Sequence, residues 1–227
     1  MQRMDTTSRD HRLAEADLPI RRCLELAYEA LKAGGLACGS VLIDGSGRAV
    51  AEGRNHAYDP PTGSDPLEGT PIGHPELNAL ARIATERDLA RDTLWSSQEP
   101  CSMCTAAAAF VGVGKIAYLA PDPWALATDQ GRAQRATEAR DVDRDGPDVS
   151  GPVGEPWRTI ANMLFILSIA ATRGPDHPTV DRSRELDPSA ARVALALLDT
   201  SRPWPPALAS LLDRVWDLLP DATAPGG

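Results

Sequence analysis

The chain has 227 residues, of which 42% are hydrophobic and 4% aromatic, and its formal net charge is −9. This length is sufficient for one medium-sized domain with a full hydrophobic core and an additional segment. Non-specific binding to nucleic acids comes mostly from Lys and Arg side chains that neutralise phosphates. Because the chain is acidic and has no dense basic run, we expect a small-molecule substrate and no nucleic-acid partner.

The sequence shows none of the features expected of a secreted or membrane protein. Residues 1–19 contain no apolar segment of the kind that a signal peptide requires. The longest apolar stretch, residues 163–171, is far shorter than a membrane span. The four cysteines are too few for a disulfide framework in a chain of this length. We therefore expect a cytoplasmic protein with no membrane association.

The first predicted elements are a helix and a hairpin. A polar, flexible segment over residues 1–16 precedes Asp17, which is a predicted N-cap. Apolar residues then recur at helical spacing over residues 20–31, and a Gly-Gly pair ends the pattern. Two short apolar runs flank a turn at residues 44–47 and predict a β-hairpin.

Strands and helices alternate in the next part of the chain. A proline-rich loop over residues 58–73 follows the hairpin, and the sequence leaves open whether it moves as a lid. We predict a helix over 75–88, a short strand over 93–96, a helix over 101–111 and a strand over 115–119. This alternation favours a layered α/β domain whose later strands are parallel.

The composition changes after residue 124. Residues 130–156 are charged and rich in Gly and Pro, and three helical patterns follow, the last with an apolar stripe from Leu208 to Leu218. The stripe can pack on the main domain, on a second subunit or on a partner. The predicted organisation is a flexible N-terminus at 1–16, a main domain at 17–129, a linker at 130–156 and a helical C-terminal extension at 157–220.

Two short motifs carry the chemistry, and each begins a predicted helix. The first is His74-Pro75-Glu76, in which proline is tolerated because the first helical turn needs no N–H at that position. The second is Cys101-Ser-Met-Cys104, whose two thiolates lie on one helix face and are stabilised by the helix N-terminus. Two sulfur donors and one imidazole suit Zn²⁺.

Three protein ligands leave one tetrahedral position open for a water molecule, whose pKa the zinc ion lowers to about 7. Glu76 is two residues from His74, near enough to move protons at this water without binding the metal. A C-x-x-C pair alone fits a redox pair or chance. Together with an upstream H-x-E, it matches the known signature of zinc deaminases.

These motifs resemble the cytidine deaminase-like superfamily, in particular the branch of guanine deaminases, tRNA adenosine deaminases and bacterial nucleoside deaminases. Residues 97–104, SQEPCSMC, are similar to that branch's Thr/Ser-Leu-Glu-Pro-Cys-x-Met-Cys, and residues 39–55 resemble its hairpin. The resemblance implies a three-layer α/β/α sandwich around a mixed five-stranded sheet, a bound zinc ion and a homodimer. Pro75 stands where the family has Ala, the loop between residues 55 and 74 is longer, and the C-terminal helices are not accounted for.

The resemblance also suggests substrate contacts. It assigns a substrate hydrogen bond to Asn55, although an asparagine there can equally cap the turn after the hairpin. It places the backbone around Gly39 and Ser40 along the base pocket. Asp122 and Trp124 follow the last predicted strand, where the family often closes its pocket, and are further candidates.

The function implied is hydrolytic deamination that releases ammonia, with Glu76 as the proton shuttle and His74, Cys101 and Cys104 as zinc ligands. The expected substrate is a small nucleobase, nucleoside or related heterocycle, with a purine-type ring slightly favoured by the motif text. Two alternatives remain: a deaminase of tRNA or single-stranded polynucleotides, and a non-catalytic zinc scaffold that assembles through its C-terminal helices.

Overall fold

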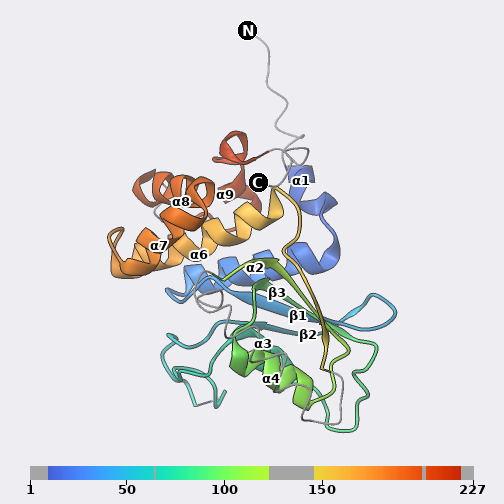
Figure 1. Ribbon diagram of the computed structural model, residues 1–227. Helices are drawn as coiled ribbons and strands as arrows, with labels where there is room; N and C mark the ends of the chain where they lie inside the picture. Colours follow the sequence, from blue (N-terminus) through green and yellow to red (C-terminus); the bar gives the residue numbers. More distant parts are fainter. Residues whose placement is uncertain (1–9, 64, 123–145, 201–202, 221–227) are drawn as a thin grey trace.

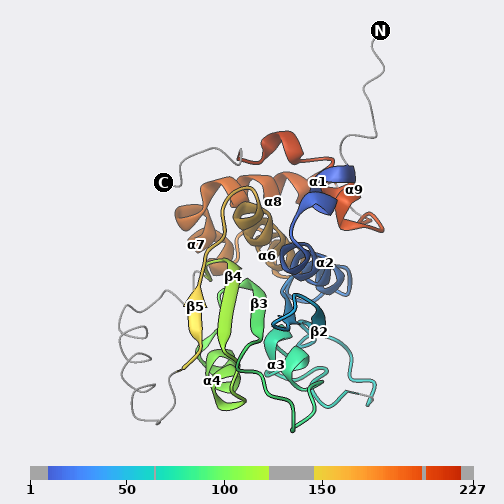
Figure 2. The same ribbon diagram turned by 90° about the vertical axis from the view of Figure 1, so that its right-hand side faces the viewer.

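A mixed five-stranded sheet with the strand order β2-β1-β3-β4-β5 organises the computed structural model (Figures 1 and 2). The structure describes residues 10–63, 65–122, 146–200 and 203–220. The strands are β1 (Gly39–Ile43), β2 (Ala49–Arg54), β3 (Thr93–Gln98), β4 (Lys115–Ala120) and β5 (Asp148–Ser150). The strand β1 pairs antiparallel with β2 and β3, whereas β3, β4 and β5 are parallel. The expected mixed sheet is confirmed.

Helices cover both faces of this sheet and give the expected three layers (Figure 1). The helices α2 (Leu18–Lys32) and α6 (Trp157–Arg173) lie on one face, and α3 (Pro75–Leu80) and α4 (Ser102–Phe110) lie on the other. The remaining helices pack outside α2 and α6: α1 (Asp10–Glu15), α7 (Pro178–Leu186), α8 (Pro188–Thr200), α9 (Leu208–Leu212) and a 3₁₀ helix (Trp216–Leu218). No helix within the described ranges is long and apolar enough to cross a bilayer.

The C-terminal helices are part of the larger of two apolar cores. This core joins α2 and α6 with α8 and α9, whereas a smaller core lies between the sheet and the pair α3 and α4. Four members of the predicted apolar stripe are buried in the larger core, and Leu218 is 40% exposed. The stripe therefore packs on its own chain. The buried members are Leu208, Leu211, Leu212 and Val215.

Several boundaries differ from those expected from the sequence. The helix α3 ends at Leu80 and not at residue 88, because residues 84–88 are exposed and an extended helix would have no surface to bury there. The edge strand β5 lies in the range expected to be a linker, and its three residues, of which only Val149 is apolar, are too few to show a strand pattern (Figure 2). The helix α7 was not predicted, and α9 is shorter than its sequence pattern. Asp17 occupies the N-cap position of α2 but makes no capping hydrogen bond with its side chain.

A glycine allows α3 to lie directly on β2. A Cβ atom on Gly53 would be 2.3 Å from the carbonyl oxygen of Pro75 and 2.6 Å from the backbone nitrogen of Ala79. Both distances are far below van der Waals contact, so no larger residue fits unless α3 moves. Gly53 therefore sets the position of the helix start that carries His74 and Glu76.

Replacement of Gly53 by Ala is expected to lower the free energy of unfolding by about 1–3 kcal/mol, because α3 must shift to admit the methyl group. Gly154→Ala is the matched control, since no atom lies within 4 Å of its added Cβ. Urea unfolding of the two variants measures the difference. Equal midpoints for Gly53→Ala and Gly154→Ala would contradict this account of the helix position.

Candidate metal centre and its cavity

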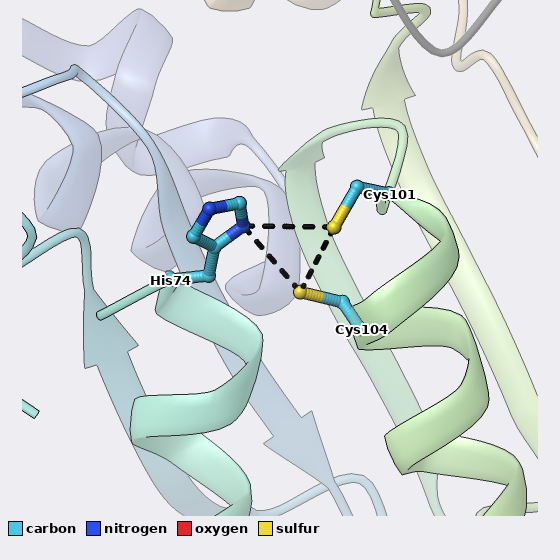
Figure 3. A group of neighbouring side chains, drawn as sticks. All are labelled: His74, Cys101 and Cys104. Carbon is cyan, nitrogen blue, oxygen red and sulfur yellow. Dashed lines mark hydrogen bonds between the residues drawn. The ribbon is translucent and has the colours of Figure 1, made fainter. Parts of the chain in front are cut away.

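Three possible metal ligands meet between the starts of two helices (Figure 3). His74 and Cys101 are the N-cap residues of α3 and α4, and Cys104 lies in the first turn of α4. The Nδ1 atom of His74 is 3.7 Å from Sγ of Cys101 and 3.6 Å from Sγ of Cys104, and the two sulfurs are 3.6 Å apart. Tetrahedral zinc, with Zn–S near 2.3 Å and Zn–N near 2.0–2.1 Å, separates its ligands by about 3.5–3.8 Å. The donor set and its spacing therefore fit zinc.

Local sequence explains why both helices begin at these donors. Pro75 occupies the first turn of α3, where its fixed φ angle favours the helix and its missing N–H has no partner to lose. The chain enters α4 directly after β3, and the N–H of Glu99 donates to the carbonyl of Ala120 at 2.8 Å. That hydrogen bond holds the segment before Cys101 against the end of β4.

The electrostatic environment favours a thiolate at Cys101. The hydrogen bond that it shares with Cys104, together with the one to His74, lowers the pKa of Cys101 to about 4. The contact with Cys101 in turn raises the pKa of His74. The positive end of α4 acts in the same direction on the cysteine. A thiolate is the form that binds metal, so the site is arranged for a cation.

Glu76 is the buried acid next to these donors. Its side chain is 4% exposed, and burial raises its pKa. The hydroxyl of Ser96 on β3 donates a hydrogen bond of 2.5 Å to Oε1 of Glu76. The carboxyl group is therefore fixed in orientation and largely shielded from solvent.

A cavity of about 280 Å³ opens beside His74, Glu76 and Cys101. The residues that line it come from distant parts of the sequence, including several from α6 and from the start of α7. Its remaining lining residues are Leu36, Cys38, Asn55, Tyr58, Pro75, Gln98, Glu99, Asp122, Phe165, Ile169, Arg173, His177 and Thr179.

The structure brings some of the expected substrate contacts to this cavity and not others. Asn55 and Asp122 line it, and Oδ1 of Asn55 also accepts a hydrogen bond of 3.1 Å from the N–H of Ala57. Gly39 and Ser40 are buried in β1 and are not among the lining residues, because the close packing of α2 on Gly39 keeps them in the core. The residue before them, Cys38, lines the cavity in their place. Trp124 lies outside the described residues.

Among the lining residues that the sequence analysis did not identify, one has a recognisable sequence signal. Gln98 lines the cavity and stands where the branch motif has leucine, which marks it as unusual. Its side chain is 5% exposed, and neither its nitrogen nor its oxygen has a hydrogen-bond partner among the described residues. The contributions of α6 and α7 had no local signal, since they depend on how these helices pack over the sheet.

A second group of possible ligands, His56, Asp59 and Glu68, lies in the loop at residues 55–73, and its two carboxylates are engaged in other contacts. Arg54 donates to both carboxylate oxygens of Asp59, at 3.1 and 2.5 Å, and Thr62 donates to Glu68. The N–H of His56 donates to the carbonyl of Gly73, and the N–H of Gly69 donates to the carbonyl of His56. These contacts fold the proline-rich loop back on itself.

Comparison with known proteins matches residues 15–120 to the family model of the cytidine and deoxycytidylate deaminase zinc-binding region. A probable cytosine deaminase of Schizosaccharomyces pombe is 28% identical over 108 residues, which cover 47% of this chain and 61% of the relative. A tRNA-specific adenosine deaminase of Haemophilus influenzae is 29% identical over 106 residues, which cover 45% and 57%. The chain thus spans about three fifths of the length of these curated relatives.

A solved structure of a guanine deaminase from Nitrosomonas europaea matches with a TM-score of 0.50 at 21% sequence identity. The match covers 75% of this chain and 97% of that chain. The likeness at this level of identity shows the fold, and the matched family model describes a zinc-binding region.

The purified protein is expected to contain about one zinc ion per chain, and Cys104→Ala is expected to lose it because only two donors remain. Cys23→Ala is the matched control, since Cys23 is buried in α2 and belongs to a different part of the core. Atomic absorption on dialysed protein gives the stoichiometry. Full zinc content in Cys104→Ala would remove this cysteine from the ligand set.

Proposed function

We propose that the chain is a hydrolytic deaminase of a small heterocycle, because residues 15–120 match the zinc-binding region of cytidine and deoxycytidylate deaminases. The observation that carries the proposal is the buried Glu76, two residues from His74, at a cavity that His74 and Cys101 also line. A scaffold protein needs neither a three-donor set nor a buried acid at a cavity, whereas a hydrolase needs both.

In this proposal His74, Cys101 and Cys104 hold the zinc ion. When bound there, zinc supplies a Lewis acid that makes a water molecule acidic enough to attack at neutral pH. Glu76 takes one proton from the attacking water and gives it to the ring nitrogen. It then takes the proton of the newly formed hydroxyl group and gives it to the amine, so that the C–N bond breaks, a carbonyl forms and ammonia leaves. Ser96 is a positioning residue, because its hydrogen bond to Oε1 of Glu76 leaves Oε2 for proton transfer.

The form of the cavity supports a small ring as substrate. Its volume of about 280 Å³ is near the lower end of the usual range for ligand sites, and Phe165 and Ile169 give it an apolar wall. We assign the polar contacts with the ring to Asn55 and Asp122. A net charge of −9 disfavours a polynucleotide. The motif at residues 97–104 slightly favours a purine ring, because it is similar to the motif of the guanine and tRNA adenosine deaminase branch. The names of the relatives include deaminases of both purines and pyrimidines.

Ammonia release should be found for at least one member of a panel of purine and pyrimidine bases, nucleosides and nucleotides. Glu76→Gln is expected to lower kcat by about 10²–10⁴-fold, because the proton carrier is lost. The same variant should keep its zinc, since Glu76 is outside the donor group. An enzyme-coupled ammonia assay provides the rates.

Ammonia release that persists unchanged in Glu76→Gln would contradict the proposed role of this residue. Zinc-bound protein that releases no ammonia from any member of the panel would favour the scaffold alternative.

We also infer that the protein is a homodimer. Three apolar residues of α4 and its C-cap are exposed: Met103 in the first turn by 37%, Phe110 at the end by 85% and the C-cap residue Val111 by 42%. Apolar side chains grouped in this way are typical of an interface. Phe110→Glu is expected to shift the mass in light scattering from dimer to monomer, whereas Leu186→Glu, at an exposed apolar residue of α7, should leave it unchanged. A monomeric wild type would contradict the inference.

A further inference from the structure

Three residues of α6 form a stripe that runs along the cavity. Phe165, Ile169 and Arg173 are spaced four apart, so they lie on one face of the helix, and all three line the cavity. Phe165 is 8% and Ile169 4% exposed, whereas Arg173, the last residue of α6, is exposed. With a helical rise of 1.5 Å per residue, Arg173 begins about 6 Å beyond Ile169. The stripe therefore leads from an apolar wall to a guanidinium group at the mouth.

The guanidinium group of Arg173 is held in place by Tyr58. Nη2 of Arg173 donates to the Tyr58 hydroxyl at 2.8 Å, and Cζ lies 5.2 Å from the centre of the tyrosine ring. Tyr58 belongs to the proline-rich loop and also lines the cavity. Arg173 thus bridges the C-terminal helices and this loop, with its remaining donors available to a ligand.

Arg173 has no carboxylate partner in the described part of the structure. Several other arginines do form ion pairs with acidic side chains, in the pairs Arg22–Glu52, Arg54–Asp59, Arg87–Asp92 and Arg158–Glu155. In a chain with a net charge of −9, a guanidinium group at a cavity mouth without such a partner is a specific feature of that mouth.

Two acidic residues other than Glu76, Glu99 and Asp122, also line the cavity. Asp122 acts electrostatically on His74 and Cys38, which places its charge toward the metal donors. Glu99 and Asp122 also have interaction partners of their own. His177, at the start of α7, supplies a further hydrogen-bond donor to the cavity. Its Nδ1 accepts a hydrogen bond from the N–H of Thr179, so the ring proton is on Nε2.

We propose that the substrate carries an anionic group, a phosphate or a carboxylate, and that Arg173 binds this group at the cavity mouth. The ring then lies between the metal donors and the apolar wall of Phe165 and Ile169. A guanidinium group binds both anions through paired hydrogen bonds, and it offsets the repulsion that an acidic protein exerts on an anionic ligand. This inference rests on the proposed function and narrows its substrate class to anionic heterocycles.

Two measurements test the proposal. The first compares ammonia release from neutral nucleosides, their monophosphates and ring carboxylates, which distinguishes the two sources of the anion. Arg173→Gln should lower kcat/KM for the preferred anionic substrate by about 10- to 100-fold more than for its neutral counterpart, because only the anionic substrate loses a charged contact. Arg173→Lys should restore part of the loss.

The second measurement is independent of turnover. Equilibrium dialysis of the same ligands against Glu76→Gln protein should show tighter binding of an anionic ligand than of its neutral form, and a loss of this preference when Arg173→Gln is added. Arg48→Gln is the matched control, since Arg48 is exposed and lies at the hairpin turn, at the other end of β1 from Cys38. Circular dichroism melting shows whether each variant is folded.

The outcomes separate this inference from the proposed function. An anionic preference that depends on Arg173 and not on Arg48 supports it. Deamination or binding in which neutral and anionic forms are equivalent, or in which Arg173→Gln has no effect, overturns it. Preferred binding of a single-stranded oligonucleotide over every monophosphate also overturns it. Arg173-dependent anion binding without ammonia release from any ligand would leave the anion site in place and refute the deaminase.

Discussion

The structure depends on one geometric constraint, which is that the starts of two helices must lie within bonding distance of a single ion. His74 comes from α3, which follows the loop after an edge strand, and Cys101 and Cys104 come from α4, which follows β3. Neither helix holds the three donors 3.6–3.7 Å apart by itself. The position of α3 is set by its close approach to Gly53, and the entry to α4 is set by the hydrogen bond between Glu99 and Ala120. Sheet packing thus pre-forms the metal site.

The helix α6 connects this site to the rest of the molecule. It packs against α2 and over β3 and β4, and its buried residues contribute much of the larger core. The same helix presents Phe165, Ile169 and Arg173 to the cavity. A segment that the sequence marked only as a C-terminal extension therefore supplies both a layer of the fold and one side of the cavity. Both its burial and its contribution to the cavity wall result from its packing over β3 and β4.

The parts of the site that the sequence predicted are those with local determinants. His74, Glu76, Cys101 and Cys104 are read from spacing within two short motifs, and Pro75 marks the first helix start. The central strands follow from apolar runs and turn residues. The strand β5 and the helix α7 lack an apolar periodicity of their own, and their structure depends on packing against segments that are distant in the sequence. The sequence therefore did not predict them. The cavity wall was missed for the same reason, because Phe165 and Ile169 are typical core residues until packing places them beside Glu76.

The distribution of charge in the cavity indicates how an anionic substrate would be oriented. With zinc bound, the thiolates of Cys101 and Cys104 balance its two positive charges, and an ionised Glu76 leaves one net negative charge at this end. Asp122 adds to the negative potential near His74. An anionic group is therefore repelled from the metal end and attracted to Arg173 at the mouth, so a substrate that carries one enters with its neutral ring first. In the proposed reaction this orientation brings the amine-bearing carbon to Glu76 and keeps the charged substituent near solvent, where its desolvation costs least.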